Sequence, residues 1–338
     1  MTRTGPVVAF GLCLAVSGVA HAARAEHTPP TAPCQLHEVG ELPIEIVAGQ
    51  LVVDGSINDQ TVRMVVDTGS PGTLLSRPAA EALGLPIRKV EGLKFYGVGG
   101  EDSGERAHIK EFKVGALEAS DFDMAVSGGR DMGGTQGLLG AKFLLQADVE
   151  FDVPEGKLRF FMPDTCQSDQ VVYWRQPYAV APMIGTDSDE IRVTVLLNGR
   201  PIEAQMDTGS SLSVLTRKGA DDVGVRTSEA NKSGVMRMQG IGPRLVPVSS
   251  HVFPSFSFGD ETIRNARIPI ADLFVDSTVS EMGSHIGRSA VDQPQMLLGA
   301  DFFRSHRVYV SRGQRKVYVS YEGGPVFAAD AASAAKSN

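Results

Sequence analysis

Two aspartates, Asp67 and Asp207, stand in the same four-residue sequence, Asp-Thr-Gly-Ser. Each follows an apolar stretch typical of a strand and precedes a second apolar stretch. If the two carboxyl groups met in one site, they could not both ionise easily, so they would hold one proton between them. The charged carboxylate could then accept a proton from water while its protonated partner donated to a carbonyl oxygen. The pair therefore suits general acid and general base catalysis of water attack on an amide.

The residues that follow each aspartate have matching roles in such a site. The threonines would bond across to the opposite loop, and the glycines would let backbone N–H groups approach the carboxylates. The serine hydroxyls would bond the outer carboxylate oxygens. These supporting residues are Thr68, Gly69, Ser70, Thr208, Gly209 and Ser210.

The elements that must position the aspartates are repeated along the chain. Asn58 and Asn198 lie nine residues before the two aspartates. Each marks a hairpin turn whose second strand leads to the aspartate. Ser76 and Thr216 lie nine residues after them, and each is expected to cap a short helix.

Two more pairs of segments follow in the same order. The segments 95–100 and 238–243 carry Gly-apolar-Gly and are expected to form hairpin tips. The segments 137–144 and 296–303 both contain Leu-Leu-Gly and precede alternating strands. We therefore interpret the chain as a duplication of one domain.

The repeated motifs resemble those of a known protein family. Val66–Ser70 and Met206–Ser210 resemble the active-site signature of aspartic peptidases, and Leu138–Gly140 and Leu297–Gly299 look like the hydrophobic-hydrophobic-Gly motif of that clan. The short repeats are similar to the retropepsin-like lobe, whereas the tandem arrangement in one chain resembles pepsin. The resemblance covers roughly residues 41–321. It implies a mostly β fold with short helices, in which two similar closed β-barrel-like lobes are related by a pseudo-twofold axis, and it implies no cofactor.

The resemblance also implies flaps over the aspartates. The matching tip residues are Gly97, Val98 and Gly99 in the first half, and Gly240, Ile241 and Gly242 in the second. Tyr96 resembles the flap tyrosine of pepsin-like enzymes, but a packed strand tyrosine is the alternative, and it receives no catalytic role. Pro71 and Gln205 depart from the usual pattern around the two motifs without removing a catalytic group.

The N-terminal residues predict export. A basic residue precedes an apolar run over 7–16, and Ala20–Ala22 forms a small-x-small cleavage pattern, with Ala23–Ala25 as a second option. This is typical of a secretory signal peptide over residues 1–22, because the apolar run is too short to span a bilayer. The mature protein is expected to be periplasmic or secreted. In an oxidising compartment, Cys34 and Cys166 could pair in a disulfide.

Composition excludes several other classes of function. The chain has 338 residues, 42 % of them hydrophobic, and a net charge of −8. An acidic chain argues against nucleic acid as a partner, and no later apolar stretch is long enough for stable membrane insertion. The His residues form no HExxH or paired metal-binding spacing, so no metal is expected.

The expected organisation follows from the paired landmarks. Both halves stand in one chain, so a monomer is plausible. Trp174, in the connector, is expected to pack at the junction of the lobes. The segments are a signal peptide (1–22), a first retropepsin-like lobe (41–163), a connector (164–176), a second such lobe (177–321) and a flexible tail (322–338).

The leading hypothesis is an exported aspartic endopeptidase that hydrolyses peptides or proteins with an Asp67/Asp207 pair. The alternative is a non-catalytic relative that binds extended peptides without cutting them. A purely structural duplication is the third reading. Turnover of a peptide pool distinguishes the first reading from the second.

Overall fold

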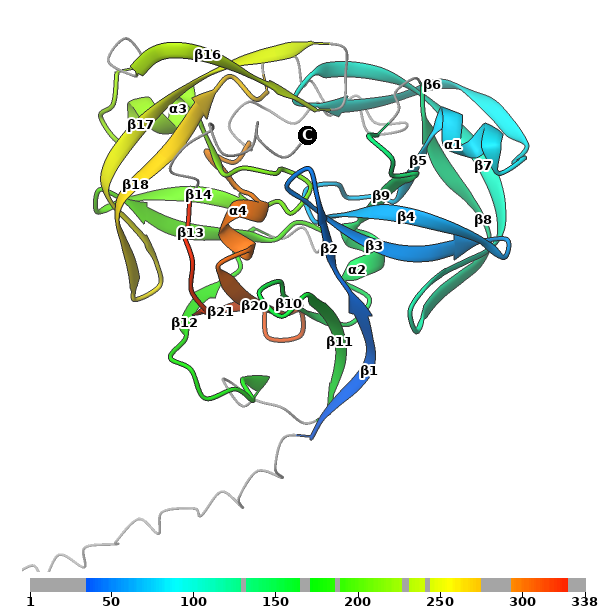
Figure 1. The fold of residues 1–338 in the computed structure, drawn as a ribbon, viewed down its shortest axis with the longest axis horizontal. Helices are drawn as coiled ribbons and strands as arrows, with labels where there is room; N and C mark the ends of the chain where they lie inside the picture. The colour runs from blue at the N-terminus through cyan, green and yellow to red at the C-terminus, as the bar shows by residue number, and fades with distance from the viewer. Residues whose placement is uncertain are drawn as a thin grey trace, which may run out of the picture. The chain divides into compact units, whose positions relative to one another are not determined.

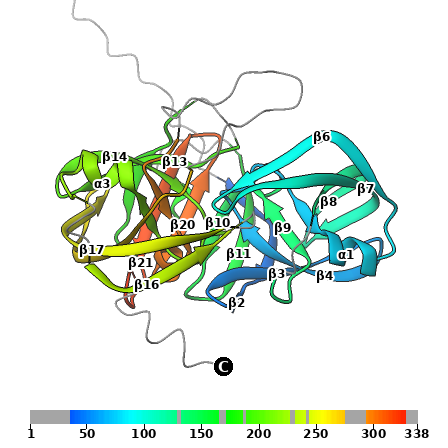
Figure 2. The same cartoon turned by 90° about the horizontal axis from the view of Figure 1, so that it is seen from above.

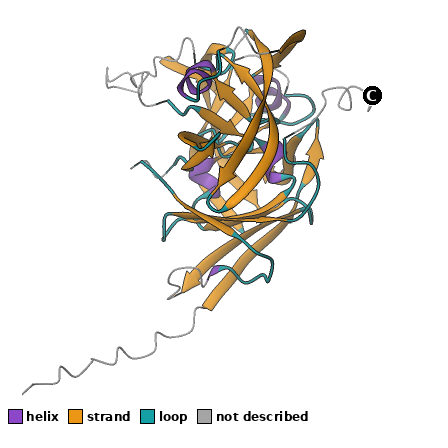
Figure 3. Cartoon of the chain, turned by 90° about the vertical axis from the view of Figure 1, so that its left-hand side faces the viewer, coloured by secondary structure: helices purple, strands orange, loops and turns teal. Residues whose placement is uncertain are grey.

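A computed structural model describes residues 35–128, 132–164, 171–185, 189–226, 231–240, 244–274 and 293–327 of the chain. The predicted signal peptide, Cys34, Cys166, Ile241 and Gly242 lie outside these ranges, so the signal peptide and the disulfide stay predictions. The fold is mostly β, as expected, and strands predominate over short helices (Figure 3). Within the described ranges, none of the helices is long and apolar enough to cross a membrane.

The described strands form three sheets (Figure 1). The first lobe is an eight-stranded sheet in the order β2-β3-β4-β9-β5-β8-β7-β6. Its strands are β2 (Glu45–Val47), β3 (Gln50–Ile57), β4 (Gln60–Asp67), β5 (Leu74–Ser76), β6 (Ile87–Gly97), β7 (Gly100–Val114), β8 (Leu117–Ser127) and β9 (Gly137–Gly140).

The second lobe is a seven-stranded sheet in the order β13-β14-β19-β15-β18-β17-β16. Its strands are β13 (Arg192–Leu197), β14 (Arg200–Met206), β15 (Val214–Thr216), β16 (Asn231–Gln239), β17 (Leu245–Phe258), β18 (Glu261–Ala271) and β19 (Met296–Leu298). Apart from β2, this order repeats the first lobe strand for strand. The additional β3–β7 and β13–β17 pairings repeat as well. The predicted duplication is therefore confirmed, and closure of each lobe into a barrel stays a prediction.

The third sheet takes strands from both halves of the chain. Its order is β1-β11-β10-β20-β21-β12. The strands are β1 (Gln35–Pro43), β10 (Asp148–Asp152), β11 (Lys157–Asp164), β12 (Ala179–Pro182), β20 (His306–Ser311) and β21 (Lys316–Tyr321). β10 and β20 pair antiparallel at its centre. The two halves thus share one sheet, which the sequence pattern alone did not indicate.

Local sequence explains the turns that lead to the aspartates. Asn58 and Asp59 join β3 to β4 with φ of 48° and 67°, and Asn198 and Gly199 join β13 to β14 with φ of 52° and 75°. Asn, Asp and Gly are the residues that tolerate this left-handed conformation in two-residue hairpins. Both predicted hairpins are confirmed.

The described short helices are α1 (Arg77–Ala82), α2 (Ala141–Leu144), α3 (Arg217–Asp222) and α4 (Ala300–Phe303). Two of them, α1 and α3, begin as the sequence predicts. The Ser76 hydroxyl accepts a hydrogen bond from the Ala79 N–H at 3.2 Å, and the Thr216 hydroxyl accepts one from the Gly219 N–H at 2.9 Å. These side chains satisfy N–H groups that have no partner inside the helix.

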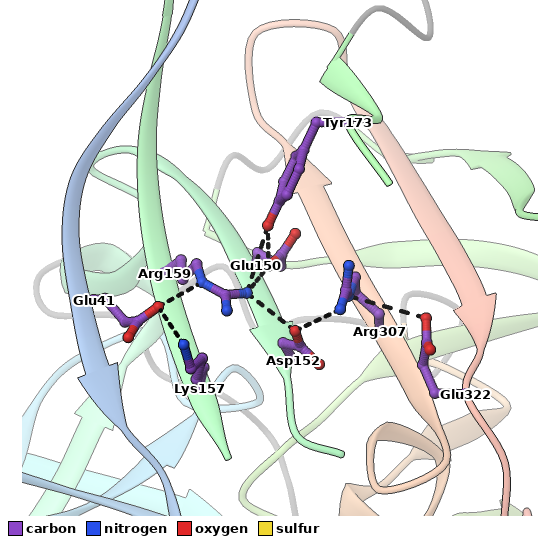
Figure 4. Close-up of polar contacts among 8 residues, drawn as sticks. All are labelled: Glu41, Glu150, Asp152, Lys157, Arg159, Tyr173, Arg307 and Glu322. Carbon is purple, nitrogen blue, oxygen red and sulfur yellow. Dashed lines mark hydrogen bonds and ion pairs between the residues drawn. The ribbon is translucent and has the colours of Figure 1, made fainter. Parts of the chain in front are cut away.

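A charge network joins the two halves across the shared sheet (Figure 4). Asp152, which is fully buried, forms ion pairs with Arg159 of the first half at 3.0 Å and with Arg307 of the second half at 2.7 Å. Glu150, also buried, accepts from Arg159 and from the Tyr173 hydroxyl. Buried carboxylates need such partners because removal from water disfavours the charged form.

Trp174 lies beside this network. It packs in a cluster with Phe161 from the first half and Tyr309 and Tyr318 from the second, and the Arg307 guanidinium lies 5.5 Å from its ring centre. The prediction that Trp174 packs at the junction of the lobes is therefore confirmed.

Candidate active site

Equivalent strands carry the two aspartates to the site. Asp67 is the last residue of β4, which pairs in parallel with β9 so that Asp67 lies opposite Gly140. Asp207 directly follows β14, and its N–H donates to the Leu298 carbonyl at 2.8 Å. In each lobe, the Leu-Leu-Gly segment therefore supports the loop that carries the aspartate.

Each aspartate is held by the backbone of its own loop. Asp67 Oδ1 accepts from the Gly69 and Ser70 N–H groups at 2.9 and 3.0 Å. Asp207 Oδ1 accepts from Gly209 at 3.0 Å and from Ser210 at 3.2 Å. Hydrogen bonds to the charged form of a carboxyl group favour that form, so both loops are built to hold a carboxylate.

The two threonines link the loops to each other. The Thr68 hydroxyl donates to the Met206 carbonyl at 2.7 Å and accepts from the Thr208 N–H at 3.0 Å. Reciprocally, the Thr208 hydroxyl donates to the Val66 carbonyl at 2.7 Å and accepts from the Thr68 N–H at 3.1 Å. Both threonines are fully buried. The expected contact across the two halves is present and symmetric.

The glycines let the carboxyl groups meet. A Cβ atom on Gly69 would lie 2.3 Å from Asp207 Cγ, and a Cβ atom on Gly209 would lie 2.3 Å from Asp67 Cγ. Each carboxyl group therefore packs directly against the glycine of the opposite loop. Any other residue at either position would push the two aspartates apart.

The environment shifts both carboxyl groups toward the protonated form. Burial raises the pKa of Asp67 well above its usual value, and the neighbouring charge of Asp207 raises it further. Burial also raises the pKa of Asp207, and its hydrogen bonds oppose this effect. Because the two groups interact, they titrate as a pair, and there is a pH range in which they share one proton.

The serines differ from the sequence-based expectation. The Ser70 hydroxyl donates to the Gly72 carbonyl at 2.9 Å, and the Ser210 hydroxyl donates to the Leu212 carbonyl at 2.7 Å. Their hydroxyls thus close local turns and do not donate to the outer carboxylate oxygens. The serines support the aspartates through their backbone N–H groups instead.

The predicted flaps meet at their tips. Gly97 and Gly100 close the β6–β7 hairpin, with Val98 and Gly99 between them. The Gly99 carbonyl accepts from the Arg244 N–H at 3.0 Å, next to the second tip. A Cβ atom on Gly240 would lie 2.9 Å from Val98 Cβ. The tips of β6–β7 and β16–β17, the long hairpins in Figure 2, therefore touch.

The remaining flap prediction concerns Tyr96. Its backbone lies in β6 opposite Glu101, and its side chain is outside the described part of the structure. The flap tyrosine and the packed strand tyrosine both remain predictions.

Sequence reasoning missed a third carboxyl group near the second loop. Asp301, only 2 % exposed, accepts from both the N–H and the hydroxyl of Ser213 at 2.7 and 2.6 Å. The same hydroxyl accepts from the Gly299 N–H at 2.9 Å. Burial raises the pKa of Asp301 to about 6. The signal available in the sequence was an acid inside the apolar segment 296–303, where the first half has Lys142.

Sequence reasoning also gave no role to two glutamines. In the sequence, Gln205 stands out only as a departure from the family pattern, and no motif marks Gln50. The side chains of both reach the loops that carry the aspartates.

Other features of the described residues do not compete with this site. No group of three or more His, Cys, Asp or Glu residues among them could hold a metal ion. One surface cavity of about 620 Å³ is lined by residues around the first flap, including Lys89, Lys94 and Glu101. Another of about 480 Å³ is lined by residues 263–267 and 325–327 together with Val252. The aspartates line neither cavity, so the site is defined by its hydrogen bonds.

The comparison with family models agrees with the duplication. The aspartyl protease family model matches residues 53–143 and 193–302, once in each half. Among solved structures, the chain is similar to the aspartic proteinase from Irpex lacteus, with 12 % identity and a TM-score of 0.46, over 83 % of this chain and 97 % of that one. No curated protein matches. Because each family match contains one of the paired aspartates, the chain is a duplicated member of the aspartyl protease family.

Proposed function

We propose that this protein is an exported aspartic endopeptidase that hydrolyses peptide bonds with Asp67 and Asp207. The observation that carries the proposal is the direct packing of each carboxyl group against the glycine of the opposite loop. Both loops, both threonines and both sets of N–H donors are intact. Family membership supports peptidase chemistry in general, and the assignment of the two aspartates is our inference.

The chemistry follows from one shared proton. The ionised carboxylate accepts a proton from a bound water, whose oxygen attacks the peptide carbonyl carbon. The protonated carboxyl group donates its proton to the carbonyl oxygen, which gives a neutral tetrahedral intermediate. When the C–N bond breaks, the protonated carboxyl group gives its proton to the amine nitrogen, and a hydroxyl of the intermediate gives its proton to the other carboxylate as the carbonyl re-forms. One proton therefore again remains between Asp67 and Asp207.

The raised pKa of Asp67 sets the pH range of this state. Activity should fall in strong acid, where both carboxyl groups are protonated. It should fall again at higher pH, where both are charged. Because burial raises the pKa, the active form should persist to higher pH than an ordinary pair of carboxyl groups would allow.

The proposed substrate is a peptide or an unfolded protein segment. Val98 contacts Gly240, and the Gly99 carbonyl accepts from the Arg244 N–H. We propose that this contact opens when an extended chain enters. The proposed enzyme is a monomer, with lobes 41–163 and 177–321, because one chain supplies both aspartates.

The direct test is hydrolysis of fluorescently labelled denatured casein by the mature chain. Asp67→Asn and Asp207→Asn should each lose at least about 1,000-fold in kcat, because either change removes the shared-proton state. Asp260→Asn, at an exposed hairpin turn, is the matched control and should retain activity. Undiminished cleavage by Asp67→Asn would show that the pair is not catalytic.

The same assay, together with a binding measurement, distinguishes the endopeptidase from a non-catalytic relative that binds peptides. If the wild-type chain binds labelled peptide in fluorescence anisotropy but releases no fragments between pH 3 and 8, the non-catalytic binding relative is correct.

The proposed export is tested separately by expressing the full chain and sequencing the N-terminus of the mature protein. Cleavage after Ala22 with accumulation outside the cytoplasm is expected. An intact residue 1–22 segment on an intracellular protein would contradict it.

A further inference from the structure

Two glutamines contact the aspartate-bearing loops from the opposite halves of the chain. Gln50, at the start of β3, donates its amide Nε2–H to the Gly209 carbonyl at 3.0 Å. Gln205, in β14, donates its Nε2–H to the Gly69 carbonyl at 3.4 Å. Each glutamine therefore binds the backbone of the loop that carries the other half's aspartate.

These contacts are not products of the duplication. The two aspartates lie 140 residues apart, as do the paired threonines. At that spacing, the position equivalent to Gln50 is Glu190, and the position equivalent to Gln205 is Val65. Two unrelated positions thus supply the same kind of contact, one to each loop. Because the two contacts reach equivalent carbonyls of the two loops, they indicate a role beyond packing.

The surroundings hold Gln50 in place. It follows the β2–β3 turn at Ala48 and Gly49, which have φ of 50° and 83°. The Gly49 carbonyl accepts from Arg304 Nη1 at 3.4 Å, and a Cβ atom on Gly49 would lie 3.2 Å from Ser211 Cβ. The tip of the β2–β3 hairpin therefore packs on the second loop, close to α4 (Figure 1).

The geometry of the peptide group explains what the glutamines can do. The Gly209 carbonyl and the Ser210 N–H belong to one planar peptide unit. Gln50 binds its oxygen, while its N–H donates to Asp207 Oδ1 at 3.2 Å. A hydrogen bond to the carbonyl fixes the plane of this unit. It also polarises the N–H, which strengthens its bond to the carboxylate.

The first loop repeats the arrangement. Gln205 binds the Gly69 carbonyl, and the N–H of the same peptide unit, that of Ser70, donates to Asp67 Oδ1 at 3.0 Å. The longer glutamine contact, at 3.4 Å, is the weaker of the two, because hydrogen bonds weaken with distance.

We propose that Gln50 and Gln205 are positioning residues that hold and polarise the peptide groups behind the two aspartates, so that each carboxylate is stabilised by the opposite half of the chain. This inference rests on the proposed function for its effect on catalysis, but not for its effect on titration.

Other charged groups contact the same loops, so the variants used in a test must leave their charges unchanged. Asp301 binds Ser213 of the second loop, and Arg304 binds the Gly49 carbonyl. The two aspartates face each other. The glutamine substitutions below change none of these charges.

The test is a pH titration of the aspartate carboxyl carbons by ¹³C NMR, which needs no substrate. The Asp67 and Asp207 signals are identified by their loss in Asp67→Asn and Asp207→Asn. In Gln50→Met, which preserves side-chain length without a donor, the lower apparent pKa of the pair should rise by about 0.5 to 1. Gln205→Met should produce a smaller rise in the same direction. Gln60→Met is the control, because the Gln60 amide also donates to a backbone carbonyl, that of Leu83, but far from the site.

The inference is overturned if both variants titrate within about 0.2 of wild type, or if Gln60→Met shifts the pair equally. Should Gln50→Met fail to fold, Gln50→Asn, whose amide is one methylene too short to reach, should show the same rise. In the casein assay, Gln50→Met should move the acidic limb of the plot of kcat against pH to higher pH, with little change in KM. If the wild-type chain is inactive, the proposed function is refuted, but the titration still tests the role of the glutamines. If the wild-type chain is active and the glutamine variants titrate like it, only the role of the glutamines is refuted.

Discussion

The paired threonines allow a prediction whose size can be worked out from the structure. In Thr68→Val, the side chain keeps its shape but loses the hydroxyl. The Met206 carbonyl and the Thr208 N–H then each lose the partner that now lies at 2.7 and 3.0 Å. Both groups lie beside fully buried threonines. A buried polar group left unpaired costs about 1–3 kcal/mol, so the free energy of unfolding should fall by about 2–6 kcal/mol.

Urea unfolding followed by tryptophan fluorescence measures this change. Trp174 is the only tryptophan in the chain and lies at the junction of the halves. Thr68→Ser keeps the hydroxyl and should lose only about 1 kcal/mol for its missing methyl group. Thr262→Val is the exposed control. Its hydroxyl pairs with Ser257 on the surface, and its loss should change stability by less than about 0.5 kcal/mol.

The comparison between the two Thr68 variants decides the argument. If Thr68→Val costs no more than Thr68→Ser, the hydroxyl does not hold the loops together. The same result in Thr208→Val would remove the basis for a symmetric link between the aspartates. Casein hydrolysis should fall in parallel with stability, because the separation of the carboxyl groups depends on this link.

Three further outcomes are expected. Gly209→Ala should reduce casein hydrolysis by at least about 100-fold, because its Cβ would collide with the opposite carboxyl group; Gly72→Ala, where a Cβ meets nothing within 4 Å, should be active. The raised pKa of Asp301, about 6, means that the folded state favours its protonated form, so its contribution to stability is complete below pH 4 and is lost as pH rises through 6. Urea unfolding at pH 4 and pH 7 should therefore show a smaller pH-dependent loss in Asp301→Asn than in wild type, and an unchanged loss would contradict this. Asp152→Asn should cost about 3–5 kcal/mol in the same unfolding assay, because it removes the buried carboxylate that Arg159 and Arg307 share, whereas Asp54→Asn, in an exposed ion pair, should cost less than about 1 kcal/mol.

Features with a local cause could be predicted from the sequence. The turn at Asn58 and the cap at Ser76 depend on residues close in the chain, and both are present. The threonine link was also expected, because the duplication and the family resemblance together place two equal loops face to face. The serine hydroxyls were assigned wrongly for a local reason: the Ser70 hydroxyl donates to the carbonyl of Gly72, two residues further along the chain.

Features that depend on contacts distant in sequence could not be predicted. Gln50 and Gly209 lie 159 residues apart, and no pattern around either residue indicates their contact. The acids of β10 alternate with apolar residues, which usually indicates a face in water. They are buried with partners from other segments. β20, from the other half, supplies Arg307 to Asp152 and the hydroxyls of Tyr309 and Ser311 to Asp148, and Glu150 accepts from Arg159 and Tyr173. The shared sheet is a property of the folded pair of halves and not of either repeat.

That division of charge makes the two halves unequal partners. β10 carries Asp148, Glu150 and Asp152, whereas β20, the strand paired with it, carries an arginine and hydroxyl groups. A dimer of two first halves would set one acidic strand against another, and like charges directly opposite each other destabilise a sheet. Separately produced halves should consequently prefer each other to themselves. The two halves are therefore not interchangeable in the shared sheet.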